Sequence, residues 1–285
     1  MSQKREAAIV GIHEYPLRVA PGVSALQIKA ASASKALEDA GLSWQDVDAV
    51  YDTGTHQNIG GLGISEYLGL KPRLIDTTAV GGSSYEFQAH HAAEMISAGK
   101  ANVALLTYGS TSHSDRRAIG TAGATGLGSP TPFNNMEDPW GMTLISNYGM
   151  VKARHMHQYG TTDEQFAQIS VTTRYHAMRN PEAVKAMTDL EFVGINEITT
   201  QDVLDSRTIA WPLHLLECCM VSDGGGAVVI ASKEVAANCR QKPVWIIGGA
   251  EATKYRENEG DITVSAGAQS GPRAFSEAGV RPSEI

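Results

Sequence analysis

The stretch KALEDAGL at residues 35–42 returns as RAFSEAGV at residues 273–280, 238 positions further along the chain. Each copy has the apolar spacing of a helix and closes on the pair Ala-Gly, in which glycine ends the helix. The apolar stretch IVGIHE at 9–14 precedes the first copy, and IIGGAE at 246–251 precedes the second, 237 positions later. Two strand-to-helix units at nearly one offset indicate a duplicated domain.

The second copy is shorter than the first. SWQDV at 43–47 corresponds to RPSEI at 281–285, where the sequence stops. The first copy continues from this point into further strands and helices. We therefore expect the second half to be incomplete here, with its remainder either cut off or supplied by another chain.

Short apolar runs alternate with helical patterns in the first copy. The patterns predict strands at 7–11, 49–51, 73–78, 103–108 and 227–230, and helices that end at Gly41 and near Ala98. The strand–helix–strand order predicts a parallel sheet with right-handed crossovers.

Residues 109–141 interrupt this order with many glycines and prolines and little periodicity. A stretch of this length is typical of a lid or binding loop, or else of a disordered segment. Helical patterns resume at 142–158. A capping box pairing Thr161 with Glu164 predicts another helix, which we expect to end at Asn180-Pro181.

The composition narrows the class of protein. The chain has 285 residues, of which 42% are apolar and 19% charged, and its formal net charge is −8. Nucleic-acid binding is disfavoured because it needs a basic surface. No apolar run is long enough for a transmembrane helix, and the first residues lack a signal-peptide pattern. Three cysteines, two of them adjacent, form no disulfide framework and no CxxC metal motif. We expect a cytoplasmic α/β protein.

The stretch RHMHQYGTTDEQFA at 154–167, together with PLHLLECC at 212–219 and SDGGGA at 222–227, resembles the thiolase superfamily. The similarity is to the sterol-carrier-protein thiolases and their lipid-transfer-protein-like relatives. It implies a five-layered α/β/α/β/α fold made of two similar halves. These would be an N-terminal half at 1–240, with a loop insertion at 109–160, and the truncated start of a C-terminal half at 241–285.

The chain departs from thiolases at the nucleophile. The thiolase cysteine stands in a Cys-Ala-Ser/Thr-Gly turn, where a helix N-terminus lowers the pKa of its thiol. The matching run here starts with Ala79, so the position lacks a thiol. We expect Cys218 and Cys219 to be buried packing residues. An acyl-enzyme on cysteine is therefore not expected.

The turn after Ala79 supplies candidate site residues. Backbone N–H groups around Gly81, Gly82 and Ser84 are predicted to bind an enolate or thioester oxygen, although a tight turn with serine capping needs the same residues. Ser83 is a candidate catalytic hydroxyl, but no base accompanies it in the sequence. Tyr255, beyond the first strand of the second repeat, is the candidate acid or base, against the simpler interpretation of an exposed loop tyrosine.

The histidines and isolated basic residues give weaker indications. The pairs His90/His91 and His155/His157 are unsuited to one metal ion; the ring directions of His90 and His91, for example, differ by about 100° on a helix. We interpret the first pair as packing residues and His214 as a structural hydrogen-bonding residue, and we expect no metal. Three basic residues are possible contacts of the CoA phosphates: Lys254, Arg116 and Arg117.

Three functions remain open. The first is retro-aldol cleavage of a β-hydroxyacyl-CoA from a sterol or lipid side chain, without a cysteine nucleophile. The second is acetyl-CoA acyltransferase (thiolase) activity, and the third is a non-catalytic acyl-CoA or sterol scaffold. The resemblance implies acyl-CoA as substrate, no cofactor, a homodimer that meets along 73–78, and a partner protein with a DUF35-type OB-fold.

Overall fold

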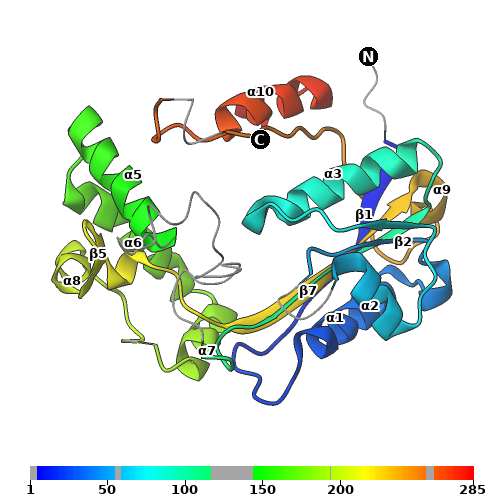
Figure 1. The fold of residues 1–285 in the computed structure, drawn as a ribbon, viewed down its shortest axis with the longest axis horizontal. Coiled ribbons are helices and arrows are strands. Elements are labelled where there is room, and N and C mark those ends of the chain that lie inside the picture. Colours follow the sequence, from blue (N-terminus) through cyan, green and yellow to red (C-terminus); the bar gives the residue numbers. More distant parts are fainter. Residues whose placement is uncertain (1–4, 55–58, 117–143, 193, 255–259) are drawn as a thin grey trace, which may run out of the picture.

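A six-stranded sheet in the order β3-β2-β4-β7-β1-β8 organises the molecule (Figure 1). The computed structural model describes residues 5–54, 59–116, 144–192, 194–254 and 260–285. The strands of this sheet are β1 (Ala7–Glu14), β2 (Ala49–Tyr51), β3 (Leu74–Asp76), β4 (Val103–Thr111), β7 (Asp223–Ser232) and β8 (Val244–Trp245). The prediction of an α/β fold is confirmed.

The prediction of a parallel sheet holds for β1, β2, β3 and β4, which run in one direction, but not for β7. Strands β2, β3 and β4 are parallel, but β7 lies antiparallel between β4 and β1. Thr111 at the end of β4 faces Asp223 at the start of β7, so the chain returns along its neighbour without a crossover. The apolar run at 227–230 reads as a buried strand in either direction, which is why the sequence pattern could not give its orientation.

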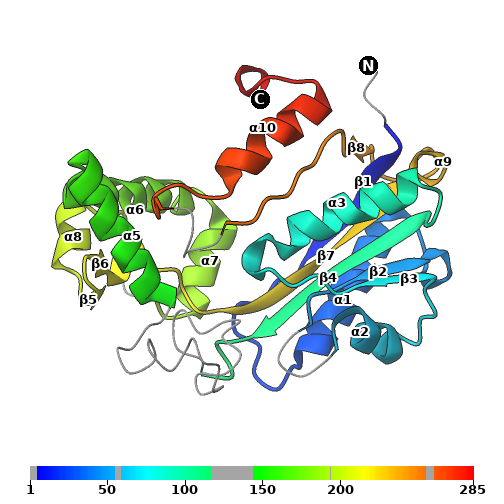
Figure 2. The same cartoon turned by 45° about the horizontal axis from the view of Figure 1, so that its top comes forward.

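Helices cover both faces of the sheet (Figure 2). Helix α1 (Ala25–Ala40) and helix α2 (Gly60–Leu68) lie on one face, and α3 (Ser84–Ser97) lies on the other. Ser24 caps α1 through a capping box with Gln27, and Gly41 ends the helix at φ 75°. Each face buries its own apolar cluster, so the sheet is the shared wall of two cores.

The internal repeat is visible in the structure, because a glycine in each copy packs in the same way against the helix that follows it. Gly11 lies against α1 so closely that an added Cβ would stand 2.2 Å from the carbonyl oxygen of Ala36. Gly248 lies in the same way against α10 (Gly267–Ala278), where an added Cβ would stand 2.7 Å from the carbonyl oxygen of Ala274. Glycine is required at both positions because the helix backbone occupies the space of any side chain.

A hydrogen bond is repeated as well. The Ile12 N–H donates to the carboxylate of Asp39 over 3.0 Å, and the Gly249 N–H donates to that of Glu277 over 3.2 Å. Each bond ties a strand-like segment to the helix that follows it.

The layers follow the predicted order, except that segment 246–251, predicted as the strand of the second repeat, is not a strand. Segment 246–251 packs on the far side of α3, since a Cβ on Gly249 would touch the His90 ring, and α10 covers this segment (Figure 2). Helices α1 and α2, the sheet, α3, segment 246–251 and α10 thus succeed one another. The boundary at residue 240 stays a prediction.

Residues 144–222 form a helical lobe between β4 and β7. Its elements are α5 (Leu144–Tyr159), α6 (Asp163–Ala177), α7 (Pro181–Asp189), α8 (Thr200–Asp205), β5 (Thr208–Ala210) and β6 (Leu213–His214). The buried Lys152 ammonium holds the lobe together through ion pairs of 2.6 Å to Asp163 and to Glu217. A short helix, α9 (Lys233–Ala236), follows β7.

One local prediction for the lobe needs correction. The capping box of α6 pairs Thr162 with Gln165, one residue beyond the predicted Thr161 and Glu164, and Thr162 has the extended backbone of a cap. Asn180 caps the next helix, α7, through the Glu182 N–H.

No helix in the described part of the chain is long and apolar enough to cross a membrane.

Candidate active site

The turn that links β3 to α3 presents the residues predicted for catalysis. Ala79 is exposed, and the one-turn 3-10 helix Gly81–Ser83 leads from it into α3. Gly81 has a φ of 85°, which a residue with a side chain rarely adopts, and both glycines face open space. Ala79 therefore stands at the surface of this chain beside a helix N-terminus, as the alignment with the thiolase cysteine requires.

Some polar groups of this turn are hydrogen-bonded within the protein, and others have no partner among the described residues. The Ser84 hydroxyl donates to the Gly81 carbonyl over 2.6 Å and accepts the Val80 N–H over 2.8 Å, and its residue is 1% exposed. Its hydroxyl is therefore committed to the turn, whereas Ser83 is exposed. Among the described residues, no acceptor faces the N–H groups of Gly81 and Gly82, which begin a helical turn.

A buried ion pair supports the neighbouring strand ends. The Lys29 ammonium on α1 lies 2.7 Å from the Asp52 carboxylate, and both side chains are excluded from solvent. Asp52 also accepts the Thr107 hydroxyl over 2.6 Å and the Gly54 N–H over 2.7 Å. The pair joins the carboxyl end of β2 to the middle of β4 through Thr107. It could not be found from the sequence because Lys29 has the pattern of an ordinary polar helix residue.

Two phenols lie near the same turn. Tyr85, next to Ser84, hydrogen-bonds to the Thr53 hydroxyl over 3.1 Å and meets Tyr108 edge-on with 5.3 Å between ring centroids. Burial raises the pKa of Tyr85, so its phenol stays protonated. Tyr108 is 40% exposed. No sequence motif marks either tyrosine, and the tyrosine predicted from the sequence, Tyr255, lies outside the described residues.

Both ring nitrogens of His91 contact carboxylates, and its interpretation as a satisfied packing residue stays a prediction. Its Nδ1 lies 2.7 Å from Asp76 at the end of β3, and its Nε2 lies 2.8 Å from Glu251. Burial raises the pKa of Asp76, but hydrogen bonds from Thr78 and His91 outweigh it and hold the pKa below its ordinary value. The neighbouring residue along α3, His90, contacts the same Glu251 over 3.4 Å.

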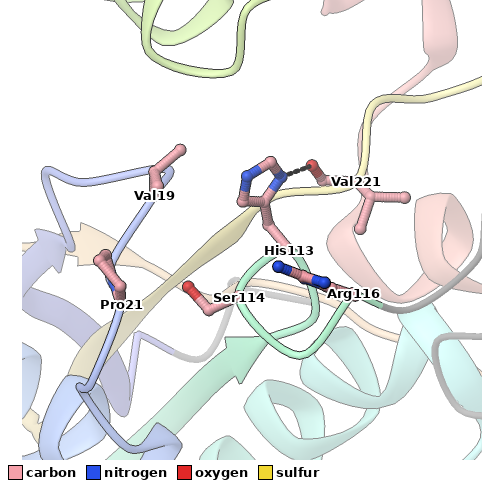
Figure 3. A pocket seen from close by; sticks show the side chains of 6 residues that line it. All are labelled: Val19, Pro21, His113, Ser114, Arg116 and Val221. Carbon is pink, nitrogen blue, oxygen red and sulfur yellow. Dashed lines mark hydrogen bonds between the residues drawn. The ribbon is translucent and has the colours of Figure 1, made fainter.

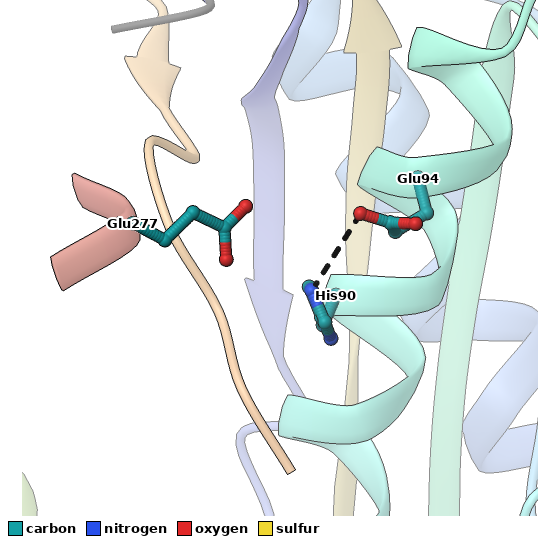
Figure 4. Close-up of side chains that lie close together, drawn as sticks. All are labelled: His90, Glu94 and Glu277. Carbon is teal, nitrogen blue, oxygen red and sulfur yellow. Dashed lines mark ion pairs between the residues drawn. The ribbon is translucent and has the colours of Figure 1, made fainter. Parts of the chain in front are cut away.

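His90 also belongs to a possible ligand set with Glu94 and Glu277 (Figure 4). One ligand atom from each lies within 4.8 Å of the others. The carboxylate of Glu277 already accepts the Gly249 N–H, in the manner of Asp39 in the first repeat. The repeat thus gives Glu277 a structural role that needs no ion.

A cavity of about 440 Å³ opens where β4 ends and β7 begins (Figure 3). It is lined by Val19, Pro21, His113, Ser114, Arg116 and Val221. The buried Asp223 beneath it accepts the N–H and hydroxyl of Ser114 and the N–H of Ala20. Burial raises the pKa of Asp223, but these hydrogen bonds outweigh it and lower the pKa.

Of the two predicted phosphate contacts that the structure describes, Arg116 and Lys254, Arg116 is the one that could reach a ligand. It is exposed and lines the cavity. Lys254 donates to the backbone carbonyls of Asp261 and Val264 and so braces its own loop. Arg117 lies outside the described residues.

Two cysteines and two histidines named from the sequence lie in or beside the helical lobe. Cys219 is exposed and Cys218 half-buried, which corrects the prediction that both are buried; the pair follows the 3-10 helix Leu215–Glu217 and precedes the exposed Met220. Burial raises the pKa of Cys218, which disfavours the thiolate. His214 donates through Nδ1 to the Ser206 carbonyl over 2.8 Å and is structural, as predicted. His155 packs on the Tyr159 and Phe166 rings.

Comparisons with known proteins return both an aldolase and an acyltransferase. No family model matches the chain. The chain is 30% identical to the steroid side-chain-cleaving aldolase of Thermomonospora curvata, over 98% of the chain and 72% of that protein. It is also 30% identical to the acetyl-CoA acetyltransferase of Methanothermobacter thermautotrophicus, over 99% of the chain and 72% of that protein. The solved Ltp2-ChsH2(DUF35) aldolase matches with a TM-score of 0.83 at 27% identity, over 99% of the chain and 72% of that structure.

Proposed function

The chain belongs to the thiolase superfamily, in its sterol-carrier-protein-like branch, and on that premise we propose that it is an enzyme that cleaves a β-hydroxyacyl-CoA by a retro-aldol reaction. The acyl group is proposed to be a sterol or lipid side chain. The similarity to a steroid side-chain-cleaving aldolase supports both parts of the proposal.

The reaction needs a base, an electrostatic site and an acid. The base takes the proton of the β-hydroxyl, the bond between the α- and β-carbons breaks, and the β-carbon becomes a ketone. The bonding electrons pass to the thioester oxygen as an enolate, which protonation at the α-carbon converts to a shortened acyl-CoA. The N–H groups of Gly81 and Gly82, which have no acceptor among the described residues, suit the enolate oxygen, and Tyr255 is the proposed acid or base.

The observation that carries the proposal is the exposed Ala79 at the helix N-terminus where thiolases need a thiol. A retro-aldol reaction forms no acyl-enzyme and needs no nucleophile at this position. The acyltransferase alternative is weaker because the thiols of Cys218 and Cys239 have their pKa values raised by burial. A non-catalytic acyl-CoA or sterol scaffold would equally lack a thiol, and measured turnover separates it from the aldolase.

The assembly is also a proposal. We propose a homodimer that meets along β3, an edge strand whose Ile75 is 40% exposed. The similarity to an aldolase named with a DUF35 component supports a partner of that type. A cytoplasmic location and catalysis without a cofactor or metal are part of the same proposal.

The test supplies a CoA thioester with a tertiary β-hydroxyl and analyses products by mass spectrometry, with a DUF35-type partner present in one arm. A ketone and a shortened acyl-CoA in equal amounts are expected. Tyr255→Phe should lower turnover, and Ser83→Ala tests whether that hydroxyl takes part. A second arm supplies a β-ketoacyl-CoA with free CoA. Thiolysis in this arm, abolished by alkylating Cys218 or Cys219, would instead establish the acyltransferase.

A further inference from the structure

One face of α3 carries two side chains that can ligate a metal ion. His90 and Glu94 are four positions apart, so they are neighbours on the same face of the helix. Glu277 extends toward them from α10, and one ligand atom of each of the three side chains lies within 4.8 Å of the others (Figure 4). Two helices from different copies of the repeat thus bring an imidazole and two carboxylates together.

The ring of His90 is held in one orientation. Its Nδ1 hydrogen-bonds to Glu251 over 3.4 Å, and a Cβ added to Gly249 would stand only 2.5 Å from the ring atom Cδ2. With its proton on Nδ1, a neutral imidazole turns the lone pair of Nε2 toward Glu94. A histidine that ligates a metal through one nitrogen usually donates its other N–H to a carboxylate, as His90 does here.

The two glutamates have no basic partner. Among the described residues, no lysine or arginine side chain pairs with Glu94 or Glu277. Glu277 accepts the Gly249 N–H through Oε2, and its carboxylate has further lone pairs for an ion. Nε2 of His90 lies 3.9 Å from the Glu94 carboxylate, which is too long for a hydrogen bond. A cation between these groups would therefore satisfy lone pairs that now face one another.

The ligand types and their spacing fit zinc. Imidazole nitrogen and carboxylate oxygen bind Zn²⁺ at about 2.0–2.2 Å in a tetrahedral arrangement. Two such bonds place their ligand atoms about 3.4 Å apart, so atoms now within 4.8 Å would approach by about 1.4 Å at most. Rotation of the Glu94 side chain, which is 62% exposed, can supply this approach. Three protein ligands leave the fourth position to water.

We propose that His90, Glu94 and Glu277 form a zinc site that links α3 of the first copy to α10 of the second. The ion would fix α10 and segment 246–251 against α3, the helix that begins after the Ala79 turn. No step of the retro-aldol reaction passes through it, so the inference goes beyond the proposed function and stands or falls without a substrate.

The first experiment titrates the full chain, without a histidine tag, with zinc chloride in a calorimeter. One equivalent of Zn²⁺ per chain is expected to bind. X-ray absorption at the zinc edge should then show nitrogen and oxygen ligands at about 2.0–2.2 Å and no sulfur at about 2.3 Å. Sulfur ligands would place the ion on the cysteines and overturn the proposal, and so would the absence of stoichiometric binding.

Substitutions then assign the ligands. Glu277→Gln keeps a side-chain oxygen for the Gly249 N–H but removes the charge that binds the ion, so it separates ligation from the structural hydrogen bond. Glu251→Gln alters only the partner of the ligating ring and should lower the zinc affinity by on the order of 10–100-fold. His90→Asn, Glu94→Gln and Glu277→Gln each remove a ligand and should lower it further.

Two matched controls keep the ligand set intact. Glu86→Gln removes an exposed carboxylate elsewhere on α3, and Asp39→Asn changes the equivalent of Glu277 in the first copy, where it accepts the Ile12 N–H. Both should bind zinc as wild type does. Zinc should also raise the melting temperature of wild type and of both controls, but not that of Glu277→Gln. Equal zinc affinity or an equal thermal shift in Glu277→Gln would show that α10 supplies no ligand and would overturn the proposal.

Discussion

A thiol introduced at position 79 tests the alignment on which the proposed function depends. In Ala79→Cys, the new side chain would stand at the exposed turn before α3, beside the N–H groups of Gly81 and Gly82. These groups have no acceptor among the described residues, so they can donate to a thiolate. The substitution therefore restores the local environment that lowers the pKa of a thiolase cysteine.

The size of the effect can be worked out from those two donors. Hydrogen bonds to a charged group contribute about 1.5–3 kcal/mol when well formed, and exposure reduces this to about 2 kcal/mol for both together. One pKa unit corresponds to about 1.4 kcal/mol. The pKa of the new thiol should therefore fall from about 8.5 to about 7.

Iodoacetamide alkylation followed by peptide mass spectrometry measures this pKa. The rate at position 79 is recorded from pH 5 to 10, and its midpoint is compared with that of the exposed Cys219 in the same sample. The midpoint is decisive because intrinsic nucleophilicity falls with pKa and blunts the rate at any single pH. A thiol that is inert, or that titrates with the same midpoint as Cys219, would refute the alignment and leave the turn structural only.

Three further predictions address packing, pH and assembly. Gly11→Ala should lower the free energy of unfolding in urea by about 3 kcal/mol, because the new Cβ meets the helix backbone. Gly82→Ala is the control, since its new Cβ would face open space and should leave the free energy of unfolding nearly unchanged. Equal effects of the two substitutions would contradict the packing argument. Because the pKa of Asp223 is lowered, its contribution to stability is present above its unfolded value of about 3.9 and is lost as pH falls through the folded value. Asp223→Asn should therefore unfold more easily at pH 7 than wild type, with the gap narrowing below about pH 4. Ile75→Glu on the edge strand β3 should convert the dimer to monomers in light scattering, and a monomeric wild type would end the dimer proposal.

Features set by neighbouring residues could be predicted from the sequence. Ser24 caps α1 and Gly41 ends it because caps depend on residues within one helical turn. The repeat was visible because both copies keep the glycine and the alanines that let a strand pack closely on a helix. The turn at Ala79 was placed for the same reason, as a Gly-Gly-Ser-Ser run between a strand and a helix.

Features that depend on distant residues could not be predicted. The pairing of Lys29 with Asp52 joins residues 23 apart, and that of His91 with Glu251 joins residues 160 apart. Neither has a periodicity or motif, since a buried charge is recognised only through its partner. The direction of β7 could not be predicted for a related reason. It is fixed by the point at which the chain returns from the helical lobe to the sheet, and no local sequence pattern indicates that point.

The two repeats use one equivalent position differently, and this difference lies at the candidate site. Glu14 in β1 and Glu251 occupy the same place, 237 residues apart. In the first copy, Glu14 makes a local ion pair with Arg18 at the surface. In the second copy, the corresponding carboxylate contacts His91 on α3. Glu14 thus pairs with a residue four positions further along its own copy, whereas Glu251 contacts a helix of the other copy, the one that begins after the Ala79 turn.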